Sequence, residues 1–223
     1  MKIHFITCAR KGSKRLLDKN IKEIAGLKLI EYTFRFMQNC KERDLCDYLW
    51  LITDDERIKK ISLKYDIDSS YIRPEKDSLS SSTMNETVQN WLKCMNFDLE
   101  DKIMLLQPTS PVRYLEDCKN ILKMDIPMSH MIVGCVEMPG NISDYYINEK
   151  KINTTSNDLL NFIDGSYYLT DVNRLLNGEG FDMTSSDKLF KTKLKVPLDI
   201  DFEKDLYLAE LLLKEDNCKN GIF

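Results

Sequence analysis

The stretch KIHFITCARKGSKRLLDKN, residues 2–20, joins a short apolar run to a long basic loop. Residues 2–8 are apolar and β-branched, which predicts a buried strand. Similar apolar runs follow at residues 48–53 (YLWLIT), 102–106 (KIMLL) and 131–136 (MIVGCV). Segments with helical periodicity separate these runs. Strands that alternate with helices predict an α/β fold with a mainly parallel sheet and helices on both faces.

The remaining pattern completes this α/β architecture. Helices are predicted at residues 29–40, 55–65, 84–95, 115–123 and 204–214, and further strands at residues 70–72, 162–169 and 195–200. The polar stretch 140–161 predicts a short excursion from the sheet and not a separate domain. Because ligands of such sheets bind beyond the carboxyl ends of the strands, the loops after Cys8, Thr53, Leu106 and Val136 are the predicted site.

The composition narrows the classes of partner. The 223 residues carry a net charge of -4, which argues against a nucleic-acid groove or a polybasic membrane surface. No apolar run reaches the roughly 20 residues that a membrane-spanning helix needs. The seven cysteines are scattered without a C-x-x-C pair, so reduced thiols in a cytoplasmic protein are expected, and not disulfides or a zinc site.

The loop after the first strand has the composition of a polyphosphate site. Residues 9–20 contain five cations, a glycine and a serine. Cations and free backbone N–H groups beyond a strand end are what a polyphosphate requires. The loop matches neither the Walker A pattern nor G-x-G-x-x-G. A solvated basic turn is the alternative interpretation. The five cations are Arg10, Lys11, Lys14, Arg15 and Lys19.

Four segments, in order along the chain, resemble one family. Residues 9–33, ARKGSKRLLDKNIKEIAGLKLIEYT, look like the opening motif of CMP-sialic acid synthetases, the acylneuraminate cytidylyltransferases. ITDD at 52–55, LLQPTSPVR at 105–113 and PLDIDFEKDLYLAE at 197–210 also match. The resemblance implies a Rossmann-like fold of the nucleotide-diphospho-sugar transferase type, with residues 1–223 as a single cytidylyltransferase domain. It also implies a homodimer.

By this resemblance, an acceptor oxygen attacks the α-phosphate of CTP and pyrophosphate leaves, a step that depends on positioning and charge neutralisation. Arg10, Lys19 and Asp201 take the catalytic roles, and Gln107, Asp164 and Tyr168 contact a small acidic acceptor. For Arg73 a surface arginine before a proline is the alternative, and for Gln107 a turn residue. The nucleotide-binding set is Ala9, Arg10, Ser13, Lys14, Lys19, Asn20 and Arg73.

Asp199 and Asp201 are the predicted metal ligands. In a strand, side chains at i and i+2 point to the same face, and two carboxylates there repel unless a cation lies between them. Magnesium is the hard divalent cation that accompanies phosphates. The alternative is a polar strand end followed by a helix cap. The family resemblance favours Mg²⁺.

The departures from the family gather on the acceptor side. Phe162 occupies an arginine position, Asp164 an asparagine position and Ser80 an aspartate position, and the excursion is short. The primary hypothesis is transfer of CMP to a nonulosonic, sialic-acid-like sugar acid. The alternative is a phosphate-type or other acidic acceptor that gives a CDP-linked product. In either case the product is expected to serve the synthesis of a surface glycan or capsule. An inactive nucleotide-binding protein is a third possibility. A sugar-phosphate nucleotidyltransferase lacks support because G-x-G-T-R is absent.

Overall fold

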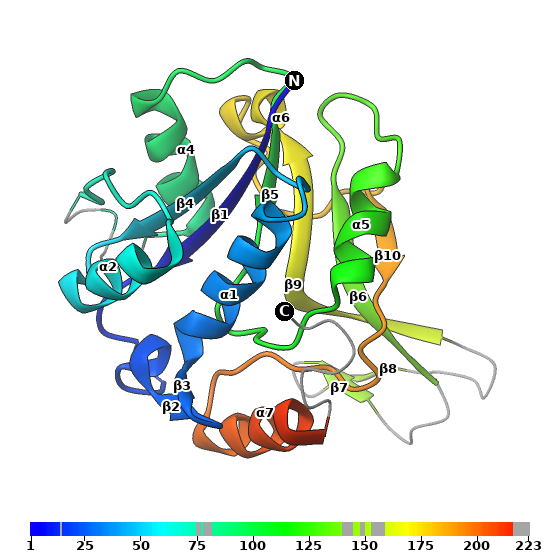
Figure 1. Ribbon diagram of the computed structural model, residues 1–223. Helices are drawn as coiled ribbons and strands as arrows, with labels where there is room; N and C mark the ends of the chain where they lie inside the picture. Colours follow the sequence, from blue (N-terminus) through cyan, green and yellow to red (C-terminus); the bar gives the residue numbers. More distant parts are fainter. Residues whose placement is uncertain are drawn as a thin grey trace.

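A six-stranded sheet forms the centre of the molecule (Figure 1). The computed structural model describes residues 1–13, 15–74, 77, 82–139, 145–147, 150–152 and 159–215. The strand order is β10-β6-β9-β5-β1-β4, and within this sheet only β9 runs opposite to the other five strands. The predicted, mainly parallel α/β sheet is therefore confirmed. The strands are β1 (Ile3–Ala9), β4 (Tyr48–Thr53), β5 (Lys102–Leu105), β6 (Ile132–Pro139), β9 (Leu159–Asp171) and β10 (Lys188–Lys191).

Helices cover both faces of the sheet, as predicted. One face packs against α1 (Leu29–Lys41), α2 (Glu56–Ser62) and α5 (Leu115–Lys123). The opposite face packs against α4 (Met84–Cys94) and α6 (Val172–Leu176), and α7 (Glu203–Glu215) packs on a third apolar cluster. Short elements complete the described chain: η1 (Lys19–Ile21), η2 (Leu63–Tyr65), and the pairs β2 (Glu23–Ile24) with β3 (Leu27–Lys28) and β7 (Tyr145–Ile147) with β8 (Lys150–Ile152).

The apolar runs form strands because both of their faces are buried. In β1, Phe5 belongs to the core beneath α1 and Ile6 to the core beneath α4, and both are 0% exposed. In β5, Met104 and Leu105 divide in the same way. A central strand of a parallel sheet has no solvent face, so its sequence is continuously apolar. The first and third apolar runs therefore lie side by side at the centre.

Two predicted strands are absent. Residues 195–200 make no ladder with the described strands, because Pro197 has no N–H to donate. The edge strand lies earlier, at β10, whose lysine-rich sequence did not suggest a strand. Residues 70–72 contribute only the single bridge Thr53–Ile72, since Pro74 follows at once. Most of the predicted excursion lies outside the described residues, and β9 already begins at Leu159.

The carboxyl ends of β1, β4 and β5 meet at one edge of the sheet, where the predicted site lies. Ala9 pairs with Thr53 at the end of two parallel strands, and Leu106 donates from its N–H to the carbonyl of Ile6. Among the described helices, none has the length and apolarity needed to cross a lipid bilayer.

Candidate active site

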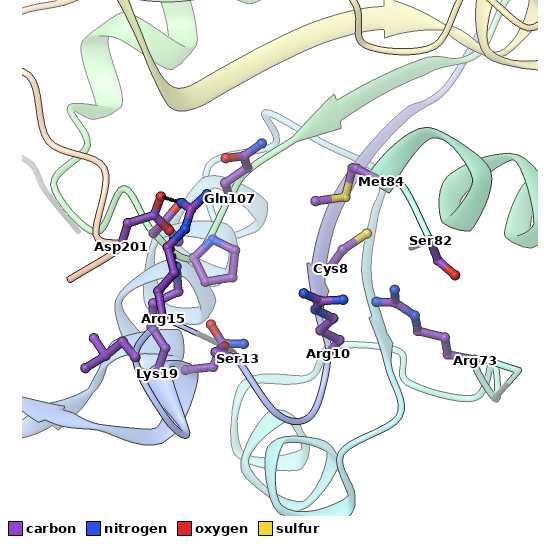
Figure 2. Close-up of a pocket in the computed structure, with 14 residues that line it drawn as sticks. Cys8, Arg10, Ser13, Arg15, Lys19, Arg73, Ser82, Met84, Gln107 and Asp201 are labelled. Atoms are coloured by element: carbon purple, nitrogen blue, oxygen red, sulfur yellow. Dashed lines mark hydrogen bonds and ion pairs between the residues drawn. The ribbon is translucent and has the colours of Figure 1, made fainter. Parts of the chain in front are cut away.

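A cavity of about 460 Å³ opens at this edge of the sheet (Figure 2). The loop after β1, the start of α4, the loop after β5 and the segment before α7 build its wall. This first cavity brings seven predicted site residues together from distant parts of the sequence. They are Arg10, Ser13, Lys19, Asn20, Arg73, Gln107 and Asp201.

The end of β4 holds the basic loop in place. The Thr53 hydroxyl donates to the carbonyl of Ala9 at 2.6 Å, and the Asp54 carboxylate accepts from the N–H of Lys11 at 2.7 Å. Both contacts fix backbone atoms of the loop. The ITDD segment therefore lies beside the site as a support for residues 9–11 and does not line the cavity itself.

Arg57 of α2 fixes the second half of the loop. Its guanidinium binds Asp55 at 2.8 and 3.0 Å and Asp18 at 2.7 and 3.2 Å. Hydrogen bonds from Arg57 lower the pKa of both carboxyl groups. Asp18 has a left-handed φ of 53° and precedes η1, which carries Lys19 and Asn20. The arginine thus holds the bend that directs Lys19 into the cavity.

Cations and one carboxylate face each other across the first cavity. The ammonium of Lys19 lies 3.0 Å from Oδ1 of Asp201, and it also donates to the carbonyl of Ile200. The guanidinium of Arg15 binds Oδ2 of the same aspartate. Arg10 and Arg73 direct their guanidinium groups into the cavity from the opposite wall (Figure 2). Four cations and one carboxylate therefore line this cavity, and the excess of positive charge suits a polyphosphate.

Arg73 is a built part of this wall and not a surface residue. It is 7% exposed, and it donates to the carbonyl of Asp77 and to the Thr87 hydroxyl, the latter at 3.1 Å. Thr87 belongs to α4, so the arginine joins the segment after β4 to that helix. The surface alternative for Arg73 is therefore wrong.

Gln107 lines the cavity and lies against a bulge in β9. The register between β6 and β9 shifts between Val133 and Cys135, which leaves extra residues on β9. Gly165 lies in that bulge with a φ of +75°, and a Cβ there would come within 2.6 Å of Oε1 of Gln107. Only glycine meets both conditions. The matched glycine therefore lets the Gln107 side chain lie against β9.

Arg113 supports the same junction from inside the core. It is 1% exposed and donates to the carbonyls of Gln107 and Ser166 and to the hydroxyl of Thr33. Burial lowers the pKa of Arg113 to about 10, so the group stays charged at neutral pH. This arginine of the LLQPTSPVR segment has a structural role and does not line either cavity.

A second cavity of about 270 Å³ adjoins the first. The two share Met84 and Gln107. Its other lining residues differ in character from the first cavity, because among the described residues that line it none is a lysine or arginine. They are Thr83, Asn85, Leu105, Tyr168, Phe181 and Asp182.

The predicted acceptor residues divide between this cavity and the core. Tyr168 lines the second cavity, and burial raises its pKa to about 12, so the phenol stays protonated and able to donate. Asp164 does not line either cavity and is 0% exposed. Its Oδ1 accepts from the N–H and hydroxyl of Ser166, while Oδ2 is buried and has no hydrogen-bond partner among the residues that the structure describes. The prediction that Asp164 contacts the acceptor directly is therefore wrong. The bulge turns its side chain inward, and burial there raises the pKa of its carboxyl group.

One further prediction, for Ala9, is wrong, and two others concern residues that the structure does not describe. The Ala9 side chain is 1% exposed and faces the core, and Cys8 lines the cavity in its place, because successive side chains of β1 alternate. Burial raises the pKa of the Cys8 thiol to about 12, which keeps it neutral and not nucleophilic. Lys14 and Ser80 lie outside the described residues.

Residues 198–201 do not pair as a strand with the described residues, but their side chains still alternate between buried and more open positions. Leu198 and Ile200 are 1% and 0% exposed, and Asp199 and Asp201 lie on the more open side between and after them. Only Asp201 lines the first cavity. Loss of surrounding water, with repulsion from Asp201 and Asp205, raises the pKa of Asp199.

This donor set fits a magnesium ion that shares its ligands with a substrate. The described residues contain no group of three or more histidine, cysteine or carboxylate side chains arranged to hold a metal alone. Magnesium beside phosphates uses one or two carboxylates, with phosphate oxygens and water completing the shell. The Asp201 oxygens are paired with Arg15 and Lys19. A bound polyphosphate would offer both cations new partners and would leave the Asp201 oxygens available to a metal ion.

Several residues that line the two cavities do not belong to the predicted site. Arg15 was counted among the cations without a role, although its ion pair with Asp201 is a clear feature of the site. Met84 and Asn85 follow the capping Thr83 of α4, a signal that marks a helix start but not a ligand wall. Phe181 and Asp182 lie in a polar loop without any motif. The last four could be found only through the tertiary arrangement.

Fold and site together define a nucleotide-dependent transferase of the α/β type. Residues 4–151 match the family described as Cytidylyltransferase, and the chain belongs to that family. It is 24% identical to the CMP-N,N'-diacetyllegionaminic acid synthase of Legionella pneumophila, with 96% of this chain and 97% of the relative covered. It is 25% identical, with the same coverage, to a pseudaminic acid cytidylyltransferase of Campylobacter jejuni.

A solved structure shares the fold. The structure of a CMP:2-keto-3-deoxy-manno-octonic acid synthetase complexed with CTP superimposes with a TM-score of 0.71 at 13% sequence identity. The match covers 97% of this chain and all of the other. At this identity the likeness establishes the α/β architecture alone.

Proposed function

We propose that this protein transfers CMP from CTP to a nonulosonic sugar acid and releases pyrophosphate. The observation that carries the proposal is the pair of adjoining cavities that meet at Gln107, the first rich in cations and the second lined by hydrogen-bonding side chains such as Thr83, Asn85 and Tyr168. The names of the full-length relatives support the acceptor class, since legionaminic and pseudaminic acids are nonulosonic acids.

In this proposal CTP lies in the first cavity. Arg10, Arg15, Lys19 and Arg73 neutralise the triphosphate, and Ser13 and Asn20 supply neutral hydrogen bonds. The acceptor hydroxyl oxygen forms the new bond to the α-phosphorus as the bond to pyrophosphate breaks, and the hydroxyl proton leaves to solvent or a phosphate oxygen. Fixed cations at the departing pyrophosphate stabilise the charge that develops there.

The acceptor lies in the second cavity. Gln107 belongs to both cavities, so its amide can orient the acceptor oxygen toward the nucleotide. Tyr168 donates a hydrogen bond and is not a base, because its pKa of about 12 keeps it protonated. Asp164 acts from beneath, through Ser166 and the bulge.

Asp199 and Asp201 are the residues that would hold magnesium. The ion would supply charge neutralisation at the phosphates and lower the pKa of a nearby acceptor hydroxyl. We further propose a single domain over residues 1–223, a homodimer and a cytoplasmic location. The free thiols at Cys8, Cys40, Cys46, Cys94, Cys118 and Cys135 support a reducing compartment.

Pyrophosphate release from CTP and magnesium tests the function directly. The acceptor panel holds sialic, legionaminic and pseudaminic acids together with phosphorylated small molecules. Release with a nonulosonic acid is the expected result, and mass spectrometry then identifies the CMP-linked product. A response to phosphorylated acceptors alone would replace the acceptor class with the CDP-forming alternative.

A further inference from the structure

The loop that follows α6 forms one wall of the second cavity. Phe181 and Asp182 contribute to that wall from residues 177–187. The Phe181 ring packs edge-on against Tyr168, with ring centroids 6.0 Å apart, and only 9% of Phe181 is exposed. The shape of the acceptor cavity therefore depends on where this loop is held.

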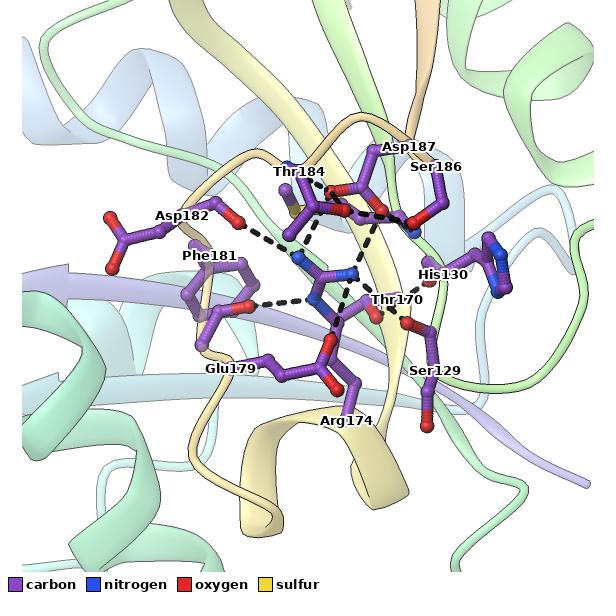
Figure 3. A network of polar contacts seen from close by, with 12 residues as sticks. Ser129, His130, Thr170, Arg174, Glu179, Phe181, Asp182, Thr184, Ser186 and Asp187 are labelled. Atoms are coloured by element: carbon purple, nitrogen blue, oxygen red, sulfur yellow. Dashed lines mark hydrogen bonds and ion pairs between the residues drawn. The ribbon is translucent and has the colours of Figure 1, made fainter.

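Arg174 holds the loop from within the core (Figure 3). Its side chain is completely buried and donates from Nε to the carbonyl of Gly180 at 3.0 Å and from Nη2 to the carbonyl of Asp182 at 2.8 Å. Asp187 neutralises the guanidinium with two contacts at 2.8 and 3.0 Å. Ser129 accepts a further hydrogen bond through its carbonyl at 3.0 Å. The two loop carbonyls on either side of Phe181 are thus fixed by one planar group.

Asn85, near the start of α4, hydrogen-bonds two residues of the same loop, Phe181 and Asp182. Its Oδ1 accepts from the N–H of Phe181 at 2.8 Å, and its Nδ2 donates to the Asp182 carboxylate at 2.8 Å. Gly180 makes this contact possible, because its φ is +63° and a Cβ there would lie 2.4 Å from Cγ of Asn85. Both the oxygen and the nitrogen of the Asn85 amide therefore form a hydrogen bond with the loop.

We propose that Asn85 and Arg174 are positioning residues for the acceptor: they fix Gly180–Asp182 so that Phe181 and Asp182 present a preformed wall to it. The inference rests on the proposed function, because it takes the second cavity as the acceptor site. Asn85 directly follows Met84, which both cavities share. The α4 start therefore sets the acceptor wall relative to the nucleotide, and loss of this contact changes acceptor binding more than CTP binding.

Variants at position 85 test the proposal without disturbing the buried arginine. Asn85→Ala is expected to raise the KM for the acceptor about tenfold, because a loop displaced by about an ångström misplaces a ligand wall. The KM for CTP and the melting temperature should stay at wild-type values. Lys93→Ala, an exposed residue further along α4, is the control and should change none of these quantities.

Exchanging the amide and the carboxylate between positions 85 and 182 distinguishes loss of the Asn85–Asp182 hydrogen bond from other effects of replacing Asn85. Asn85→Asp places a carboxylate against Asp182 and should raise the acceptor KM more than Asn85→Ala. Asp182→Asn alone measures the direct effect of changing this lining residue. Combined with Asn85→Asp it restores a donor–acceptor pair, so the acceptor KM of the double variant should lie well below the value expected from adding the effects of the two single variants. A double variant whose acceptor KM equals that additive expectation would overturn the proposal.

The outcomes distinguish this inference from the function beneath it. If wild-type protein releases no pyrophosphate with any nonulosonic acid, the proposed function fails and the inference fails with it. If the wild type turns over but Asn85→Ala keeps its acceptor KM, only the inference is wrong. If Asn85→Ala raises the KM for CTP and for the acceptor equally, the contact supports the whole site and the specific positioning role is likewise wrong.

Discussion

The two cavities that meet at Gln107 are built in different ways. Most of the cations of the first cavity come from one continuous loop, residues 10–19, supported by β4 and α2. The second cavity draws its wall from four separated segments, at 83–85, 105–107, 168 and 181–182. A polyphosphate can be bound by any dense set of cations and N–H groups, whereas an asymmetric sugar acid requires groups placed from several directions.

This difference separates the expected effects of substitution. Changes in the loop remove charge that acts on the nucleotide, so they should lower the rate or weaken CTP binding. Changes around Tyr168 and Phe181 should act on the acceptor alone. Gln107 is the position where both effects are expected together, since it lines both cavities.

Asp201→Asn should produce the largest effect on the nucleotide side. The substitution removes the carboxylate that pairs with Arg15 and Lys19 and that is placed to hold magnesium. Loss of such a charged group at the reacting phosphates is expected to lower kcat by on the order of 10²–10³-fold. Asp98→Asn, an exposed aspartate outside both cavities, is the matched control. Full magnesium-dependent turnover in Asp201→Asn would remove the metal assignment.

Lys19→Ala tests whether the loop is a directed site or a general basic patch. Lys19 lines the cavity and its side chain is 13% exposed, whereas Lys11 lies outside the cavity. Lys19→Ala should lower kcat/KM for CTP by about 10²-fold, and Lys11→Ala by less than about threefold. Steady-state kinetics at one ionic strength compares them. Equal losses would show that only the total charge of the loop matters.

Tyr168→Phe tests the acceptor side with a single oxygen. The substitution keeps the ring that packs against Phe181 and removes the hydrogen-bond donor. A hydrogen bond of ordinary strength corresponds to a rise of about 3–10-fold in the acceptor KM. The KM for CTP should not change. A selective rise in the KM for CTP would place the acceptor elsewhere and contradict the division between the two cavities.

Arg57→Ala tests how far the loop depends on its support. Arg57 makes two-pronged contacts with Asp18 and Asp55, but its own side chain is 46% exposed, so solvent screens these ion pairs and their contribution is modest. The expected result is a rise of only about 2–5-fold in the KM for CTP with kcat retained. Arg57→Lys should fall between wild type and alanine, because lysine cannot form the planar two-pronged contacts. An effect as large as that of Lys19→Ala would mean that the loop collapses without Arg57.

The same contrast explains what the sequence could predict. The buried strands of β1, β4 and β5 and the basic loop are local patterns, and their positions follow from apolar runs and from charge. The bulge at Gly165 and the edge strand β10 depend on pairing with β6, to which no local pattern points. Asp164 shows the limit most clearly: its place in the sequence suggested the acceptor site, and the register shift buries it.

The smallest functional effect is expected at the other edge of the sheet, at His4. This histidine is 2% exposed near the start of β1; its Nδ1 accepts from Trp50 at 3.2 Å, and its Nε2 faces Asp101 at 3.4 Å. A second ring proton would oppose the Trp50 N–H. Burial accordingly lowers the pKa of His4, although Asp101 opposes the shift.

Because the folded-state pKa of His4 lies below the unfolded value of about 6.5, the unfolded chain takes up the proton first as the pH falls. The contribution of His4 to stability is therefore complete above that pH and is lost below it. Asp117, whose pKa burial raises to about 6, acts in the opposite direction, so the comparison is between variants. We expect the free energy of unfolding in urea, measured from pH 7.5 to 5.5, to fall less steeply with pH in His4→Asn than in wild type. Asparagine can still accept the hydrogen bond from Trp50 but does not titrate. Turnover per folded molecule should be equal in His4→Asn and wild type, because His4 lines neither cavity.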